Sequence, residues 1–89
     1  MRAHAESEAA VRELEDARRR IAQLTQQVAI VERKIAEAAK RVVDAQTDTD
    51  RATANDQLVF LQREKAALEA RITVEHERAR DAERRANGF

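Results

Sequence analysis

Apolar residues recur with a seven-residue period along the first half of the chain. One row consists of Leu14, Ile21, Val28, Ile35 and Val42. A second row, three residues after or four before the first, consists of Ala10, Ala17, Leu24, Val31, Ala38 and Ala45. Two such rows, at the a and d positions of consecutive heptads, predict a coiled-coil helix. We therefore expect a first helix over roughly residues 5–46.

The heptad pattern stops in the middle of the chain. Between Gln46 and Asp56 the sequence holds no large apolar residue and is rich in Thr and Asp. These residue types favour helix caps and turns over helix interiors. Thr53 with Asp56 three residues later is one candidate N-cap, and Asp48 and Asp50 are two others. The pattern predicts a turn over roughly residues 46–53 and a second helix from about residue 51.

A second apolar series follows the predicted turn. It comprises Leu58, Leu61, Leu68, Ile72, Ala79, Ala82 and Ala86. Lys65 and Glu75 interrupt the series. Asn87 and Gly88 are typical of a helix C-terminus, so we expect the second helix to end near residue 87. Residues 1–89 are thus expected to form a single helical domain.

The phase of the two apolar series favours a hairpin over one continuous helix. Leu58 follows Val42 by sixteen residues. At about 100° per residue, this spacing puts the second series roughly 160° around a continuous helix from the first. A hairpin brings the two series face to face and also explains the mid-chain cluster of turn residues. The main alternative is a parallel dimer of continuous helices.

Two registers fit an antiparallel hairpin. If facing residue numbers add up to 96, Val28 meets Leu68, and Glu13 comes close to Arg85. If they add up to 103, Ile35 meets Leu68, but Val28 faces Glu75. The first register pairs more large apolar side chains and is favoured. The expected hairpin core is Leu14, Ile21, Leu24, Val28, Val31, Ile35, Val42, Leu58, Leu61, Leu68 and Ile72.

Further apolar residues lie on outer helix positions that face water in an isolated hairpin. The predicted oligomer interface is Ile30, Val43, Val59, Phe60, Ala67 and Val74. Apolar surface patches of this kind usually mark an interface. The core itself is thin, because Ala fills many inward positions and buries little area. We therefore expect a homo-oligomer, most simply a dimer of hairpins that forms a four-helix bundle, or a larger helical oligomer.

Composition and charge argue against several classes of function. The chain carries 17 basic and 17 acidic residues, whereas nucleic-acid-binding proteins normally carry a basic excess. No apolar run approaches the length of a membrane span. The N-terminal residues lack the apolar segment of a signal peptide. We expect no specific nucleic-acid partner, no membrane span and a cytoplasmic location, although a virion or secretion-apparatus component fits the same residues.

The sequence displays no constellation that supports catalysis. The histidines are His4 and His76. Neighbouring residues on a helix point about 100° apart, so Glu75, His76 and Glu77 cannot converge on one metal ion. There is no Gly-rich phosphate loop and no nucleophile beside a base. We therefore expect no enzymatic activity, no cofactor, no metal and no small-molecule ligand. The basic run Arg18–Arg20 is interpreted as part of a surface rich in ion pairs.

The predicted turn carries an acidic tip formed by Asp48 and Asp50. A coiled-coil hairpin with a carboxylate tip resembles the N-terminal hairpin of bacterial transcript-cleavage (Gre-type) factors. This resemblance covers residues 35–72 at most, and the Gly-Asp-Leu-x-Glu-Asn turn motif of that family is absent. It implies a transcription regulator that inserts its tip into RNA polymerase, where the carboxylates help to hold a metal ion.

The function predicted from the residues themselves is protein binding. Heptad rows, an outer apolar surface and the lack of a chemical site together predict a non-enzymatic coiled-coil interaction or structural module. Such a module would associate with itself and act as an adaptor or scaffold component for an additional protein partner.

Overall fold

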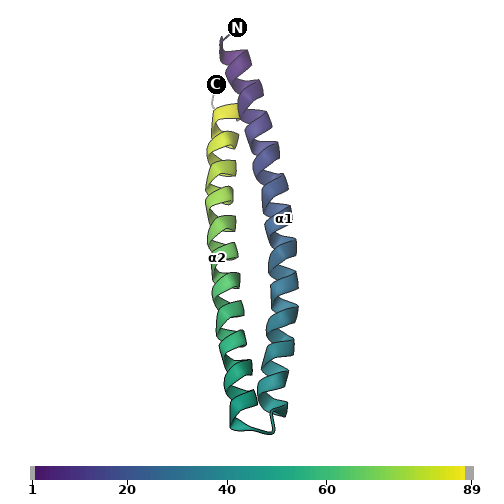
Figure 1. The fold of residues 1–89 in the computed structure, drawn as a ribbon. Coiled ribbons are helices and arrows are strands. Elements are labelled where there is room, and N and C mark those ends of the chain that lie inside the picture. The colour runs from purple at the N-terminus through teal and green to yellow at the C-terminus, as the bar shows by residue number, and fades with distance from the viewer. Residues whose placement is uncertain (1, 88–89) are drawn as a thin grey trace. The chain divides into compact units, whose positions relative to one another are not determined.

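The computed structural model describes residues 2–87, with side chains from residue 6, as two helices joined by a short turn (Figure 1). Helix α1 spans Arg2–Asp44 and helix α2 spans Asp48–Asn87. The two helices pack against each other, and the described residues contain no strand. The predicted all-α hairpin is confirmed, and the alternative of one continuous helix is wrong.

The turn is shorter than the sequence predicts and ends at a different cap. The Asp50 N–H donates to Oγ1 of Thr47 at 3.0 Å, and the Arg51 N–H donates to the Thr47 carbonyl oxygen, also at 3.0 Å. Thr47 is therefore the N-cap of α2, and the helix begins at Asp48 rather than near residue 51. The three predicted caps are therefore wrong. Asp48 and Asp50 lie within the first turn of α2. Oγ1 of Thr53 donates back to the Thr49 carbonyl oxygen at 3.0 Å inside the helix.

The hairpin divides into two compact units, each made of one segment of α1 and one of α2. We call residues 26–69 the turn unit, because they include the connection between the helices. We call residues 2–25 together with residues 70–87 the terminal unit. Each unit has its own core.

The core of the turn unit is aliphatic. Its buried residues are Val31, Ala38, Ala54, Leu61 and Leu68. A second set, four residues after or three before the buried set, is only half-buried: Val28, Ile35, Val42, Leu58 and Lys65. Both sets repeat every seven residues, as d and a positions of a coiled coil do. The d side chains point into the partner helix, whereas the a side chains keep one side open to solvent.

The core of the terminal unit follows the same period with smaller or charged side chains. Its buried residues are Ala10, Ala17, Leu24, Glu75 and Ala82. The half-buried residues on the inner side are Ser7, Leu14, Ile21, Ile72, Ala79 and Ala86. All eleven residues predicted to form the core lie in the buried or half-buried sets of the two units. Five of the eleven inner residues of the terminal unit are alanines, so several layers of this unit bury little apolar area.

Bonds between the helices identify the register. In the turn unit, Nζ of Lys65 lies 3.8 Å from Oε1 of Glu32, and these residue numbers add up to 97. In the terminal unit, Arg85 pairs with Glu13, and their numbers add up to 98. Both values match the register centred on 96, and the Glu13–Arg85 contact predicted for it is confirmed. In the alternative register, Glu13 would face a position beyond Arg85.

Candidate interaction surface

Glu75 is the one charged residue in the buried set of the described chain, with 7% of its surface exposed. It occupies a d position seven residues after Leu68, where the coiled-coil pattern requires an apolar side chain. Nε of Arg20, on α1, donates to Oε2 of Glu75 at 2.8 Å. Nη1 of Arg78, one turn along α2, donates to Oε1 at 3.0 Å. Each carboxylate oxygen thus has a guanidinium partner, as a buried charge requires.

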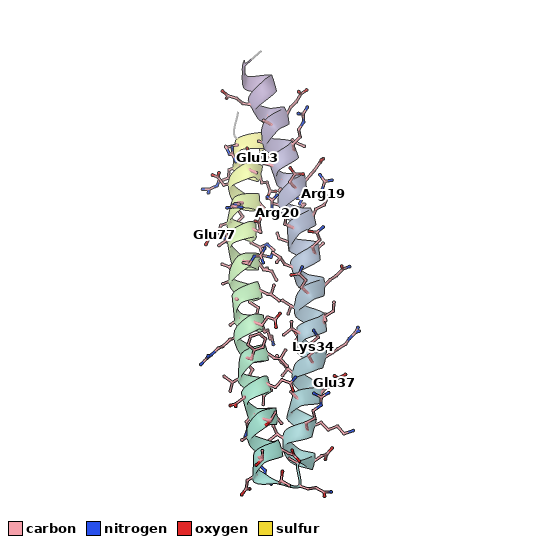
Figure 2. The ribbon with its side chains drawn as sticks, viewed as in Figure 1. Glu13, Arg19, Arg20, Lys34, Glu37 and Glu77 are labelled. Atoms are coloured by element: carbon pink, nitrogen blue, oxygen red, sulfur yellow. The ribbon has the colours of Figure 1, made fainter. Side chains whose placement is uncertain are left out.

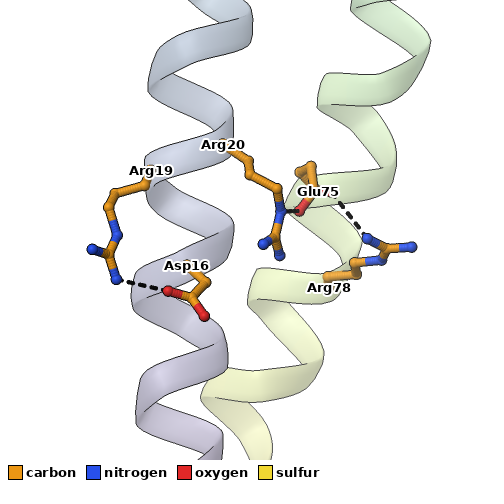
Figure 3. A network of polar contacts seen from close by, with 5 residues as sticks. All are labelled: Asp16, Arg19, Arg20, Glu75 and Arg78. Atoms are coloured by element: carbon orange, nitrogen blue, oxygen red, sulfur yellow. Dashed lines mark hydrogen bonds and ion pairs between the residues drawn. The ribbon is translucent and has the colours of Figure 1, made fainter.

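The neighbouring arginines of α1 have different roles, although they are adjacent in sequence. Arg20 points across to α2 and to Glu75, whereas Arg19 turns back to Asp16 on its own helix (Figure 3). The Arg19–Asp16 pair is exposed, with Nη2 2.6 Å from Oδ1. Because this pair is exposed and lies within α1, it contributes little to stability and does not join the helices. The contact of Arg20 with Glu75 is the one of the two that joins α1 to α2.

Near the ends of the helices, the terminal unit is closed by polar contacts. Oγ of Ser7 donates to the Ala86 carbonyl oxygen at 3.3 Å. Glu13 accepts a hydrogen bond from Arg85 across the helices, and this bond raises the pKa of the Arg85 guanidinium above its ordinary value. Figure 2 shows Glu13 and Arg20 among the side chains of α1 in this unit. In the basic run Arg18–Arg20, Arg19 forms an ion pair with Asp16 and Arg20 forms one with Glu75, as expected from the sequence.

The turn unit presents two different lateral faces to solvent. On a helix, the e and b positions lie beside a, and the g and c positions lie beside d. In an antiparallel pair, the e and b positions of both helices share one side, and the g and c positions share the other. We call the first side the smooth face: Ala29, Glu32, Ala36, Ala39, Val43, Asn55, Val59, Gln62, Ala66 and Glu69. We call the second the charged face: Gln27, Ile30, Lys34, Glu37, Arg41, Asp44, Gln57, Phe60, Glu64 and Ala67.

These two faces differ in charge. Two of the ten positions of the smooth face are charged, against five of the ten on the charged face. The two carboxylates of the smooth face, Glu32 and Glu69, both lie within ion-pair distance of Lys65, at 3.8 Å and 3.9 Å. The charged face has a shallow groove lined by Lys34, Arg41 and Glu64. Figure 2 labels Lys34 and Glu37 on this part of α1.

The six residues predicted as an oligomer interface are all solvent-exposed, but they do not form one continuous patch. Val43, which is 82% exposed, and Val59 belong to the smooth face. Ile30, Ala67 and Phe60, which is 65% exposed, belong to the charged face, where Phe60 borders the groove. Val74 lies in the terminal unit. The sequence pattern identified outer positions correctly but did not separate b positions from c positions.

The acidic tip has a structural role at the start of α2. Asp48 and Asp50 both lie in the first turn of the helix, where the backbone N–H groups favour negative charge. Oδ1 of Asp48 also lies 3.2 Å from Nη1 of Arg51.

The described side chains include no group of three or more His, Asp, Glu or Cys residues arranged to hold a metal ion. His76 is exposed next to the buried Glu75, so these neighbours diverge as predicted, and the side chain of His4 lies outside the described residues.

No family model matches the chain, and no similar curated protein or solved structure was found. Neither α1 nor α2, over the part of the chain that the structure describes, has a stretch long and apolar enough to cross a membrane.

Proposed function

We propose that the chain is a non-enzymatic coiled-coil module that associates with its own copies and holds a further protein partner as an adaptor or scaffold component. The observation that carries this proposal is the amount of apolar surface left uncovered. Val43, Val59 and Phe60 are exposed large apolar side chains, and every a-position aliphatic residue of the turn unit is only half-buried. Exposed apolar surface of this kind is typical of interfaces.

The total exposed surface supports the same proposal. The chain exposes 6872 Å². A compact monomer of 10.1 kDa would expose about 5,300 Å², so the excess is about 1,600 Å². An ordinary protein interface removes about 800 Å² from each partner. One interface of ordinary size would therefore remove about half of the excess and leave surface for another partner.

Light scattering coupled to gel filtration tests self-association directly. We expect a mass near twice 10.1 kDa at micromolar concentrations, and a concentration-dependent shift toward the single-chain mass on dilution. A mass of one chain throughout the micromolar range would contradict the proposal.

The turn gives less support to a polymerase-directed function. Asp48 is paired with Arg51, and the first-turn position of both aspartates accounts for their presence through the helix dipole. Asp48→Asn with Asp50→Asn separates the two functions. A self-associating module should keep its mass after this change, whereas a Gre-like regulator should lose its activity on a stalled polymerase.

A further inference from the structure

We propose that the second copy docks on the smooth face of the turn unit, and that the charged face takes no part in this contact. This inference rests on the proposed self-association and names the surface that performs it. Three observations carry it: the direction in which the half-buried aliphatic residues are open, the size of the side chains around them, and the placement of charge.

The half-buried aliphatic residues open toward the smooth face. Val28, Ile35, Val42 and Leu58 occupy a positions, whereas the residues buried completely occupy d positions. On each helix, an a side chain lies between the d position and the e position. Its uncovered side must therefore face the e and b positions, which form the smooth face. A second copy placed there would complete the burial of these side chains, as in the interior of a four-helix bundle.

Small side chains border this aliphatic row. Ala29 and Ala36 are seven residues apart on α1, and Ala66 holds the equivalent b position on α2. Small residues allow helix axes to approach closely, so that the half-buried aliphatic side chains reach the partner helices. At the equivalent c positions, the charged face carries the larger side chains of Ile30, Glu37 and Phe60, which would hold another helix farther away.

The charges favour the same face and a second copy of this chain as its occupant. Burying an unpaired charge at an interface is unfavourable, whereas buried charges that already have partners are tolerated. On the smooth face, Glu32 and Glu69 are both paired with Lys65. The smooth face therefore has little net charge and does not attract a strongly acidic or strongly basic partner electrostatically. A nearly neutral apolar face is complementary to itself, as a two-fold interface requires.

Two adjacent alanines offer a matched test. Ala66 lies on the smooth face and Ala67 on the charged face, and both are exposed in the single hairpin. We expect Ala66→Glu to shift the mass from two chains to one at micromolar concentration, because the new carboxylate would be buried without a partner. Ala67→Glu should leave the mass unchanged. Circular dichroism at high concentration checks that both variants stay helical.

A cross-linking experiment keeps the test valid if Ala66→Glu fails to fold. The chain has no cysteine, so single cysteines report on one position at a time. Variants with Cys in place of Ala29, Ala36 or Val43 sample the smooth face. Variants at the next residues, Ile30, Glu37 and Asp44, sample the charged face. A short bismaleimide should join two copies in the first series and not in the second.

The outcomes separate this inference from the proposed function. If the unmodified chain has the mass of one chain, self-association itself is refuted, and the docking face with it. If the chain is a dimer but Ala67→Glu dissociates it while Ala66→Glu does not, self-association stands and the smooth face is wrong. Cross-links confined to the second series of cysteines would also overturn the smooth face. Dissociation by Ala66→Glu alone, with cross-links in the first series, supports the inference.

Discussion

The turn unit and the terminal unit follow the same seven-residue period but fill it with different side chains. In the turn unit, the buried d row contains Val31, Leu61 and Leu68, and its outer surface has a face with few charges. In the terminal unit, three of the five buried residues are alanines, and a carboxylate held by two arginines takes the place of a large apolar residue. One backbone pattern is thus held together by apolar burial in one unit and by directed polar contacts in the other.

The largest effect is expected from shortening a buried aliphatic residue of the turn unit. Leu61→Ala should lower the free energy of unfolding by about 2–4 kcal/mol, because it removes apolar contacts and leaves a cavity. Leu14→Ala, at a half-buried position of the terminal unit, should lower it by about 1–2 kcal/mol. Urea unfolding followed by circular dichroism, at one fixed protein concentration, measures both. Equal losses would show that a fully buried leucine of the turn unit contributes no more to stability than a half-buried leucine of the terminal unit.

The ionic contact of the terminal unit is expected to have the next largest effect. Arg20→Ala should lower the free energy of unfolding by about 1–3 kcal/mol, because Glu75 stays buried with Arg78 as its remaining partner. Arg19→Ala is the matched control, since it removes only the exposed pair with Asp16 and should change stability by about 0.5 kcal/mol or less. If the two variants unfold at the same urea concentration, the contact with Glu75 does not hold the helices together.

Replacing the buried carboxylate should make the two units more alike. Glu75→Leu should raise the free energy of unfolding by about 1–2 kcal/mol, because apolar residues of similar volume commonly replace buried ion pairs with a gain in stability. The arginines that it leaves behind are largely exposed and remain hydrated. Thermal unfolding checks the sign, with Glu77→Leu at the neighbouring exposed position as the control. A lower melting temperature for Glu75→Leu would show that the ion pairs of Glu75 stabilise the unit more than the packing of a leucine at the same position.

The smallest effect concerns the cap of α2. Thr47→Ala should lower the free energy of unfolding by about 1 kcal/mol, because the Asp50 N–H loses its acceptor. Thr53→Ala should be neutral or slightly stabilising, since Thr53 lies inside the helix and bonds only to the preceding turn. A larger loss for Thr53→Ala than for Thr47→Ala, measured by urea unfolding, would reassign the cap.

The hairpin and its register could be predicted from the sequence because large aliphatic residues repeat every seven positions on both sides of the turn. Two features of the core could not be predicted in this way. Ala54 is buried, but it lies next to the predicted turn in a segment without large apolar residues, and its only signal is that Leu61 follows it by seven residues. Glu75 interrupts the apolar series in the sequence. Its burial depends on Arg20, which is distant in sequence and becomes a neighbour only after the hairpin forms.

The surface was less predictable than the core. Outer apolar residues such as Val59 and Phe60 are adjacent in sequence, but they belong to different faces once the a and d rows fix the rotation of α2. The cap was ambiguous for a similar reason. Thr47 with Asp50 and Thr53 with Asp56 have the same spacing, and local sequence does not determine which of the two starts the helix.

The contacts between the helices are nested around the turn, and this nesting bears on the order in which the hairpin folds. Arg41 and Gln57 are 16 residues apart, Arg20 and Glu75 are 55 apart, and Ser7 and Ala86 are 79 apart. The entropy lost on closing a loop grows with its length, by about 0.6 kcal/mol for each doubling. The contacts nearest the turn therefore close the shortest loops and lose the least entropy when they form. We expect helices α1 and α2 to associate first near the turn and then progressively toward their other ends. Leu61→Ala should therefore mainly slow folding, and Arg20→Ala should mainly speed unfolding.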